Sequence, residues 1–267
     1  MQAAAGPALV CRPLAAVAPH IFTTRRWPLG SMIPGGGDPA PWDDVARAMH
    51  VSAAQLVRVH QVHGAAVVIA EDARGRYPEA DIVVSRDPTL ALAVQAADCI
   101  PLLLADPSTG AVAAAHAGWR GLAAAVPSAA VESLAREFGS RSSDLVAAIG
   151  PAIGACCYEV GSDVRDRFEA AGATGKQLAR WFLEAPIHSA ANPSMSSVSG
   201  PRRADRWFFD GWTAARDQLA EAGVPGAQTF AAELCTASHP DVLCSYRRDG
   251  SPAGRIAGAI RRRPLHP

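Results

Sequence analysis

The chain has 267 residues, 49% of them hydrophobic, which is enough for one large globular domain or two small ones. Its 25 basic and 25 acidic residues cancel, so no overall field favours nucleic acid or an anionic membrane as a partner. No stretch reaches the roughly 18 apolar residues that a membrane-spanning helix needs. Six cysteines without an evident paired framework are typical of a reducing compartment, and we expect a cytoplasmic protein.

The first part of the chain predicts a strand, a loop and a helix. The run beginning IFTTRRW starts like a strand and continues as a long loop, because its Gly and Pro residues enforce turns. Asp43 or Asp44 could cap a helix that runs to about Met49, and Ser52 is a further candidate cap.

The segment from 65 to 115 predicts four or five short strands, which are runs of Val, Ile, Leu and Ala separated by turn signals. The turn DPSTG joins residues 100–105 to 111–115 tightly enough to predict an antiparallel hairpin. That pairing places Cys99, before the first strand of the hairpin, beside His116, after the second.

The second half of the chain predicts alternating helices and strands. Apolar residues at helical spacing favour a helix that Gly139 ends, and Ser162 is a candidate N-cap of a later helix. A flexible loop is expected at about 188–205, where the sequence is polar and rich in turn residues. The remaining elements are a strand in LVAAIG, a helix through FDGWTAARDQLAEAG and a last strand near QTFAAEL.

Strands flanked by helices, with short hairpins among the strands, predict a single mixed α+β domain. We expect this domain to span residues 1–267, with its core at about 20–260.

Three separated residues form the candidate site: His63 in VHQVHG, Cys99 in QAADCIPLLLAD and His116 in AVAAAHAGWRGL. Each lies where a strand-like run meets a polar or glycine-containing turn, so the three side chains could converge at one sheet edge. Zinc accepts two imidazoles and a thiolate, and three protein ligands leave a fourth position for water or substrate. Their spacing matches no local zinc motif.

The same trio permits a cysteine nucleophile, Cys99, that His116 activates and that His63 or a carboxylate orients. Such an enzyme would catalyse hydrolysis or acyl transfer without a metal, and the sequence does not separate the two hypotheses. A third alternative is a structural metal site in a noncatalytic protein. Copper is disfavoured, because a multicopper centre needs many closely spaced histidines and the chain has eight with no His-x-His.

Further polar residues near the predicted site are candidates for binding substrate or phosphate. They are Arg25, Gln61, Arg120 and Arg247, of which the arginines offer paired donors suited to phosphate. The adjacent Cys156 and Cys157 are predicted to be packed thiols and not a strained vicinal disulfide. The run Arg261–Arg263 is expected to be a solvated C-terminus.

The motifs FTTR, QVHG, AADCIPLLLAD, AAAHAGWRGL, IGPAIGACCYEVG and SYRRDG together resemble the laccase-like, or multicopper polyphenol oxidase, family. The resemblance runs from about Phe22 to Arg255. Members of that family have been reinterpreted as zinc-dependent purine nucleoside phosphorylases, and some as peptidoglycan editing factors. Two departures are the sequence after FTTR, which here continues Arg26-Trp27-Pro28, and Cys244, where an aromatic residue is common.

The resemblance implies that His63, Cys99 and His116 are zinc ligands. It also implies an α-β-β-α layered sandwich similar to that of cysteine hydrolases. The implied activities are phosphorolysis of adenosine, inosine and methylthioadenosine, with deamination of adenosine as a side activity. Editing of peptidoglycan precursors and polyphenol oxidation are the alternatives. We expect a monomer or small homo-oligomer that acts on a purine nucleoside and phosphate, without nucleic acid or membrane partners.

Overall fold

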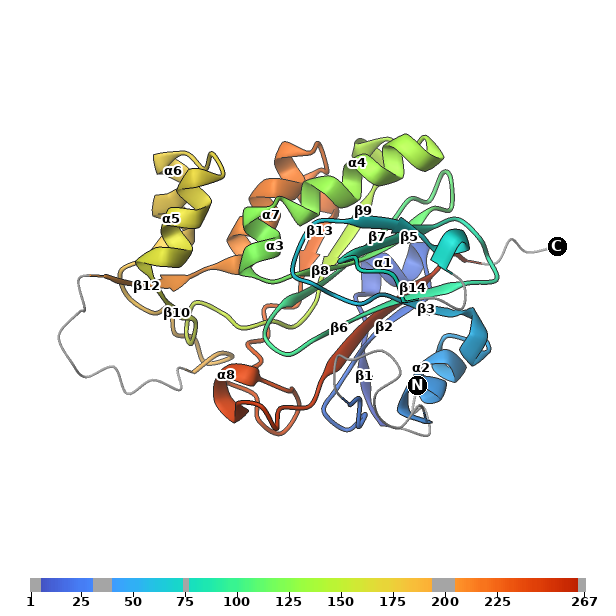
Figure 1. Ribbon diagram of the computed structural model, residues 1–267, viewed down its shortest axis with the longest axis horizontal. Helices are drawn as coiled ribbons and strands as arrows, with labels where there is room; N and C mark the ends of the chain where they lie inside the picture. The colour runs from blue at the N-terminus through green and yellow to red at the C-terminus, as the bar shows by residue number, and fades with distance from the viewer. Residues whose placement is uncertain (1–5, 31–39, 74–76, 194–204, 264–267) are drawn as a thin grey trace.

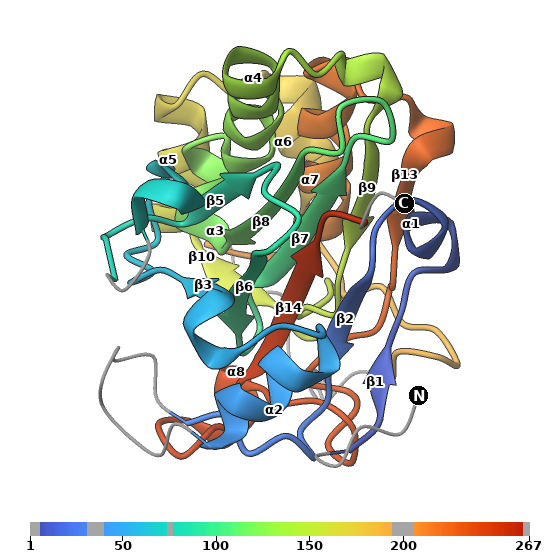
Figure 2. The same cartoon turned by 90° about the vertical axis from the view of Figure 1, so that its right-hand side faces the viewer.

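The computed structural model describes residues 6–30, 40–73, 77–193 and 205–263, which form one α+β domain (Figure 1). Two mixed β-sheets at its centre pack face to face (Figure 2). In sheet order, the six-stranded sheet consists of β13 (Thr229–Ala231), β9 (Val146–Ile149), β7 (Ile100–Ala105), β8 (Val112–Ala117), β5 (Ile82–Ser85) and β4 (Val67–Ile69). The five-stranded sheet consists of β1 (Ala8–Leu9), β2 (His20–Thr23), β14 (Ile256–Arg261), β6 (Ala91–Ala96) and β3 (Leu56–Arg58).

Alternation of side chains along the strands builds two core layers from one sheet. In β7, Leu103 packs into the layer between the sheets, whereas Leu102 and Leu104 point into the layer under the helices. In β8 the buried Ala114 shares the layer between the sheets. His116 lies two residues after Ala114, so the two side chains share one face of the sheet. The His116 side chain therefore points toward the layer between the sheets, at the end of β8.

Helices cover both outer faces of the sheet pair, which gives the predicted α-β-β-α layering (Figure 1). Helices α3, α4 and α7 cover the six-stranded sheet, and α2 covers the five-stranded sheet. The helices are α1 (Arg12–Val17), α2 (Ala40–Ala48), α3 (Trp119–Ala123), α4 (Val126–Phe138), α5 (Ser162–Ala170), α6 (Gly175–Trp181), α7 (Gly211–Glu221) and α8 (Tyr246–Asp249). Short 3-10 helices in the described residues are η1 (Ala53–Gln55), η2 (Ala70–Ala73), η3 (Ser142–Asp144) and η4 (Gly226–Gln228).

A small third sheet carries α5 and α6 at one end of the molecule (Figure 1). It consists of β10 (Glu159–Gly161), β12 (Arg206–Phe209) and β11 (Phe182–Leu183). An aromatic cluster joins this sheet to α5, with the Phe168 ring 5.1 Å from that of Phe209 and 5.4 Å from that of Phe182. These packed rings anchor the small sheet to the main core.

The predicted hairpin is confirmed: β7 and β8 are antiparallel, with Pro101 opposite His116. The expected helix after His116 is broken at Ala125, whose φ of 56° separates α3 from α4, and Gly139 ends α4 as predicted. The N-cap of α5 is Gly161 and not Ser162, which is already inside the helix.

The prediction for the C-terminal arginines is wrong for Arg261. This residue ends β14, a central strand that the sequence interpretation missed because its Ala and Gly residues give a weak strand signal. Its guanidinium donates to the carbonyls of Met49, His50 and Pro88, so it ties the end of β14 to the segment after α2 and to the turn before β6.

Most of the expected flexible loop at 188–205 lies outside the described residues, which resume at 205. Within its first part, Asn192 is buried, donates to the Glu233 carbonyl and accepts from the Cys235 amide. Among the helices that the structure describes, none is long and apolar enough to cross a membrane.

Candidate functional site

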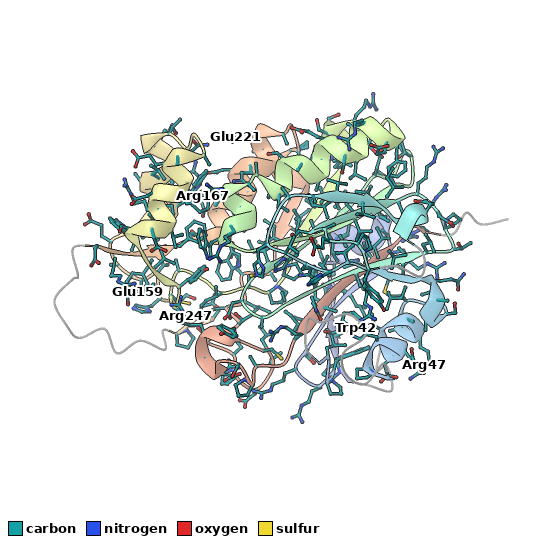
Figure 3. The ribbon with its side chains drawn as sticks, in the orientation of Figure 1. Trp42, Arg47, Glu159, Arg167, Glu221 and Arg247 are labelled. Atoms are coloured by element: carbon teal, nitrogen blue, oxygen red, sulfur yellow. The ribbon has the colours of Figure 1, made fainter. Side chains whose placement is uncertain are left out.

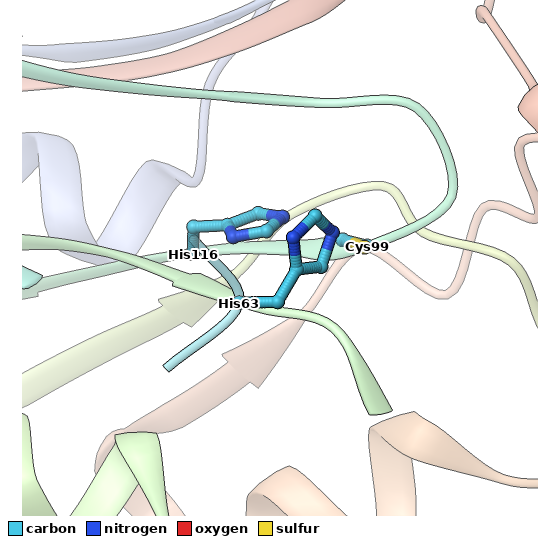
Figure 4. Close-up of side chains that lie close together, drawn as sticks. All are labelled: His63, Cys99 and His116. Carbon is cyan, nitrogen blue, oxygen red and sulfur yellow. The ribbon is translucent and has the colours of Figure 1, made fainter. Parts of the chain in front are cut away.

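His63, Cys99 and His116 meet at one end of the sheet pair, as predicted (Figure 4). Their ligand atoms all lie within 4.8 Å of one another. The two imidazole rings stand edge to face, with centroids 4.8 Å apart. His116 comes from β8, Cys99 precedes β7, and His63 lies in the loop between β3 and β4. The β7–β8 pairing brings Cys99 and His116 together, and the parallel pairing of β4 with β5 brings the His63 loop beside them.

The carboxylate of Asp81 fixes the loop that carries His63. It accepts the backbone N–H groups of Val62, His63 and Gly64, at 3.2, 3.1 and 2.7 Å. His63 has a φ of 61°, a left-handed conformation that a non-glycine residue adopts only when its surroundings hold it. The three hydrogen bonds provide that constraint.

Asp81 also orients His116. Its Oδ1 lies 2.8 Å from Nδ1 of His116, and both side chains are almost fully buried. Because a carboxylate only accepts hydrogen bonds, Nδ1 carries the proton and Nε2 of the neutral ring is left with its lone pair. This carboxylate–imidazole arrangement is the usual outer support of a metal-binding histidine.

Asp98 shapes the turn before Cys99. It has a φ of 87°, and its carboxylate accepts the Thr236 hydroxyl and the Arg247 backbone N–H, each at 2.6 Å. These bonds connect the turn to the segment after β13 and to α8, so the position of Cys99 depends on contacts made far along the sequence.

The three side chains alter one another's ionisation. Burial raises the pKa of the Cys99 thiol, but the imidazoles of His116 and His63 outweigh that effect and lower this pKa to about 6. Burial lowers the pKa of His116, but the Cys99 thiolate and Asp81 together raise it to about 9. Without a metal, a thiolate–imidazolium pair therefore predominates near neutral pH.

The donor set and its shape fit one metal ion. A tetrahedral ion with bonds of about 2.0 to 2.3 Å holds its ligand atoms roughly 3.3 to 3.8 Å apart. The ligand atoms of the trio, all within 4.8 Å of one another, are close enough to share one ion after small shifts. Gly118 leaves room for this arrangement: a Cβ there would lie 2.7 Å from Sγ of Cys99 and 3.2 Å from Cδ2 of His63. Two imidazoles and a thiolate suit zinc.

Gly118→Ala should therefore weaken binding of Zn²⁺ by about tenfold or more, since displaced ligands lose their common geometry. The φ of Gly118 is −75°, which alanine tolerates, so the effect is steric. Competition with a chromophoric chelator measures it. Gly226→Ala is the matched control, because nothing lies within 4 Å of its new Cβ; equal Zn²⁺ affinity in the two variants would contradict the assignment.

A cavity of about 370 Å³ opens beside the trio. Aromatic and guanidinium groups dominate its wall, whose members besides the trio include Gln95, Trp119, Arg120, Tyr158, Tyr246, Arg247 and Arg255. Oε1 of Gln95 is buried and has no hydrogen-bond partner within the described residues. Burial raises the pKa of Tyr158, so its phenol stays protonated and can donate.

Two of the four predicted binding residues line this cavity. Arg120 stacks over the Trp119 ring, 4.3 Å from its centroid, and makes no hydrogen bond in the part of the chain that the structure describes. Arg247 stacks over Tyr158, 5.1 Å from its ring centroid, and donates to the Glu159 carbonyl at 2.9 Å. Arg247 and Glu159 are labelled in Figure 3.

The other two predicted binding residues lie outside the cavity wall. The amide of Gln61 is bonded at both ends to the Gln95 backbone, at 2.8 Å, so it joins the β3–β4 loop to β6. Arg25 donates to the Pro240 carbonyl and is joined to Val242 by a backbone hydrogen bond.

The sequence interpretation did not identify Asp81, Gln95, Trp119, Tyr158 or Arg255 as parts of the site. For Asp81 a signal was present: a single carboxylate at the start of the apolar run ADIVVS is expensive to bury unless it has partners. The aromatic residues gave no signal, because they become neighbours only through the fold.

Fold and site together define a layered α+β protein with one His₂Cys candidate metal site beside a cavity. The family model for multi-copper polyphenol oxidoreductase laccase matches residues 41–263, and the chain belongs to this family. A crystal structure of the Bacillus licheniformis hypothetical protein YfiH is similar in fold, with a TM-score of 0.78 and 26% identity over 92% of this chain and 93% of that one.

Two relatives are named purine nucleoside phosphorylase. The protein of Deinococcus radiodurans is 35% identical over 91% of this chain and 88% of its own length. That of Bacteroides thetaiotaomicron is 34% identical, and the match covers 67% of this chain and 60% of that protein.

Proposed function

We propose that the protein is a zinc-dependent purine nucleoside phosphorylase that acts on adenosine, inosine and methylthioadenosine. The observation that carries the proposal is the position of the His63–Cys99–His116 trio, which borders a cavity walled by aromatic rings and guanidinium groups. The flat rings of Trp119, Tyr158 and Tyr246 suit a purine, and the guanidinium groups suit phosphate. The names of the relatives support the same reaction.

Phosphorolysis forms a bond between a phosphate oxygen and C1′ of the ribose, while the bond from C1′ to the base nitrogen breaks and its electron pair leaves with the base. The ribosyl carbon becomes cationic on the way. Arg120 is the best placed cation for the phosphate, because its guanidinium is held by stacking and keeps its donors available. The protonated Tyr158 can donate a hydrogen bond to the departing base.

Zinc bound by the trio would supply Lewis acidity or a bound water with a pKa of about 7. Asp81 holds His116 in the tautomer that leaves Nε2 for the metal. Oε1 of Gln95 can accept a hydrogen bond from an amino or hydroxyl group of the substrate. The same open coordination position could serve deamination of adenosine, which we propose as a side activity.

Phosphate dependence tests this proposal. Protein loaded with Zn²⁺ should release hypoxanthine from inosine only when phosphate is present, with ribose 1-phosphate as the second product, because the nucleophile is the phosphate oxygen. Chromatography of both products over a phosphate titration measures it. Hypoxanthine release that is equal without phosphate, or no release at all, would refute phosphorolysis.

A second function is favoured by one observation, the chain of contacts from Asp81 through His116 to Cys99. A thiolate whose pKa is about 6, next to an imidazolium supported by a carboxylate, is the arrangement of a cysteine hydrolase. In this alternative, Cys99 would attack an acyl group of a cell-wall precursor.

Alkylation of Cys99 tests which role the thiol has. In metal-free protein, the rate at which iodoacetamide alkylates Cys99 should reach half its maximum near pH 6, the lowered pKa of this thiol, and not near pH 9, the pKa of an ordinary thiol. The reason is that the thiolate is the nucleophile. Addition of Zn²⁺ should protect Cys99 if the thiolate is a metal ligand. Unchanged alkylation in saturating Zn²⁺, together with an acyl-enzyme that mass spectrometry detects, would favour the hydrolase.

A further inference from the structure

A second group of three side chains converges away from the candidate site. The sulfur atoms of Cys156, Cys157 and Cys235 all lie within 4.8 Å of one another. Their residues are only 2%, 4% and 0% exposed. One buried cysteine is an ordinary small core residue, but packing alone gives no reason for three sulfur atoms to meet at one point.

The sheet creates this convergence. Strand β13 pairs in parallel with β9, and the pairing continues in a bridge between Ala152 and Cys235. Cys156 and Cys157 lie in the turn that follows, where Tyr158 N donates to the Gly154 carbonyl at 3.0 Å. The two segments are 78 to 79 residues apart in sequence, so no local motif announces the group.

Polar groups contact the three sulfur atoms directly. The backbone N–H of Gly154 donates to Sγ of Cys235 at 3.3 Å, and Oγ of Ser238 lies 3.4 Å from Sγ of Cys157.

The ligand set selects the kind of ion. Thiolates are soft ligands that select copper(I), zinc or iron–sulfur clusters. Structural zinc sites take four protein ligands and iron–sulfur clusters take four cysteines, whereas this group offers three sulfur atoms in a dry setting lined by Ile153 and Ala237. A monovalent ion is also less costly to place there than a divalent one with an incomplete shell.

We propose that Cys156, Cys157 and Cys235 form a second metal site, in which three thiolates bind one copper(I) ion. Each thiol releases its proton to solvent as its copper–sulfur bond forms. The ion enters as copper(I) and is neither oxidised nor reduced.

Binding at this cysteine group would act on the wall of the cavity. Cys157 directly precedes Tyr158, which lines the cavity, and Cys235 precedes Thr236, whose hydroxyl bonds to the Asp98 carboxylate beside Cys99. An ion that joins the two segments therefore restrains two supports of the first site without touching its ligands.

Anaerobic titration of the full chain with copper(I), in competition with the chelator bathocuproine disulfonate, tests the proposal. The Cys99→Ala background removes one ligand of the first site, so that the cysteine group is measured alone. We expect about one copper(I) ion per chain to be withheld from the chelator. Cys235→Ser in this background should abolish that binding, whereas Cys11→Ser, at the start of α1, should leave it unchanged.

X-ray absorption at the copper edge, on the Cys99→Ala protein alone, keeps the test valid if the Cys235→Ser chain does not fold. Three sulfur neighbours and no imidazole nitrogen support the proposal. Imidazole ligands, the absence of withheld copper(I), or full retention after Cys235→Ser would overturn it. A preference of the group for Zn²⁺ over copper(I) would overturn the assignment of the ion.

Discussion

Cys99→Ala should lower phosphate-dependent release of hypoxanthine from inosine by more than about 100-fold, because loss of a metal ligand exceeds the 10- to 100-fold cost of losing an outer partner. The thiolate supplies the only negative charge among the three proposed ligands, so Zn²⁺ affinity should fall with turnover. Titration with a chromophoric chelator and the product assay measure the two quantities on the same preparation.

Two further variants separate loss of a ligand from loss of a thiol. Cys244 is buried in a small core cluster with Ala96, Leu243 and Ile256, and Cys99 packs against this cluster. Cys244→Ala removes that thiol and should keep full activity if turnover depends only on the trio. Cys99→Asp restores an anionic ligand without a thiol, so it should recover part of both Zn²⁺ binding and turnover. Wild-type turnover in Cys99→Ala would contradict the phosphorylase proposal, and complete inactivity of a Zn²⁺-loaded Cys99→Asp protein would indicate a nucleophile.

The hairpin shows what the sequence could predict about the site. The turn DPSTG between two apolar runs specifies the β7–β8 pairing, and alternation along β8 then places His116 on the inner face of the sheet. Local patterns were sufficient for Cys99 and His116, because a short turn sets their register. The mixed α+β domain followed from strand-rich sequence flanked by helices, whereas the α-β-β-α layering was implied by the family resemblance, and both are confirmed.

Residues positioned by long-range pairing were harder to predict. Asp81 reaches His63 and His116 only because β5 pairs with β4 on one side and β8 on the other. Gln61 was predicted to bind substrate because it is a polar residue near His63 in the sequence, but its amide completes the hydrogen bonding of the β6 backbone. Arg261 looked solvated in a run of arginines, yet three backbone carbonyls bind it. Each depends on a backbone group contributed by a distant segment.

Asp81→Asn is the second substitution with a large expected effect. It should lower the free energy of unfolding by about 2 to 4 kcal/mol and weaken Zn²⁺ binding by at least about tenfold. The carboxylate is fully buried and accepts from four donors. Asparagine has the same shape but only one acceptor oxygen. If its NH₂ replaces Oδ2, it faces the N–H groups of Val62 and Gly64. If it replaces Oδ1, Nδ1 of His116 must accept, the ring proton moves to Nε2 and that metal ligand is lost.

The stability that Asp81→Asn loses depends on pH in a definite direction. Although burial raises the pKa of Asp81, the hydrogen bonds from His116, Gly64 and Val62 bring it below its ordinary value. The carboxylate therefore stabilises the fold above about pH 4, the ordinary pKa of aspartate, and this contribution is lost as the pH falls through the lowered pKa. Urea unfolding should show the difference between wild type and Asp81→Asn shrinking at low pH.

Asp106→Asn is the matched control for the Asp81 substitution. Asp106 is also buried, and its carboxylate accepts from Ser108 and Thr109 in the β7–β8 turn, outside the candidate site. We expect this control to lose stability while keeping wild-type Zn²⁺ affinity, because no ligand of the trio depends on it. If Asp81→Asn also kept wild-type affinity, His116 would not need its tautomer fixed, and the trio would lose its main structural argument as a metal site.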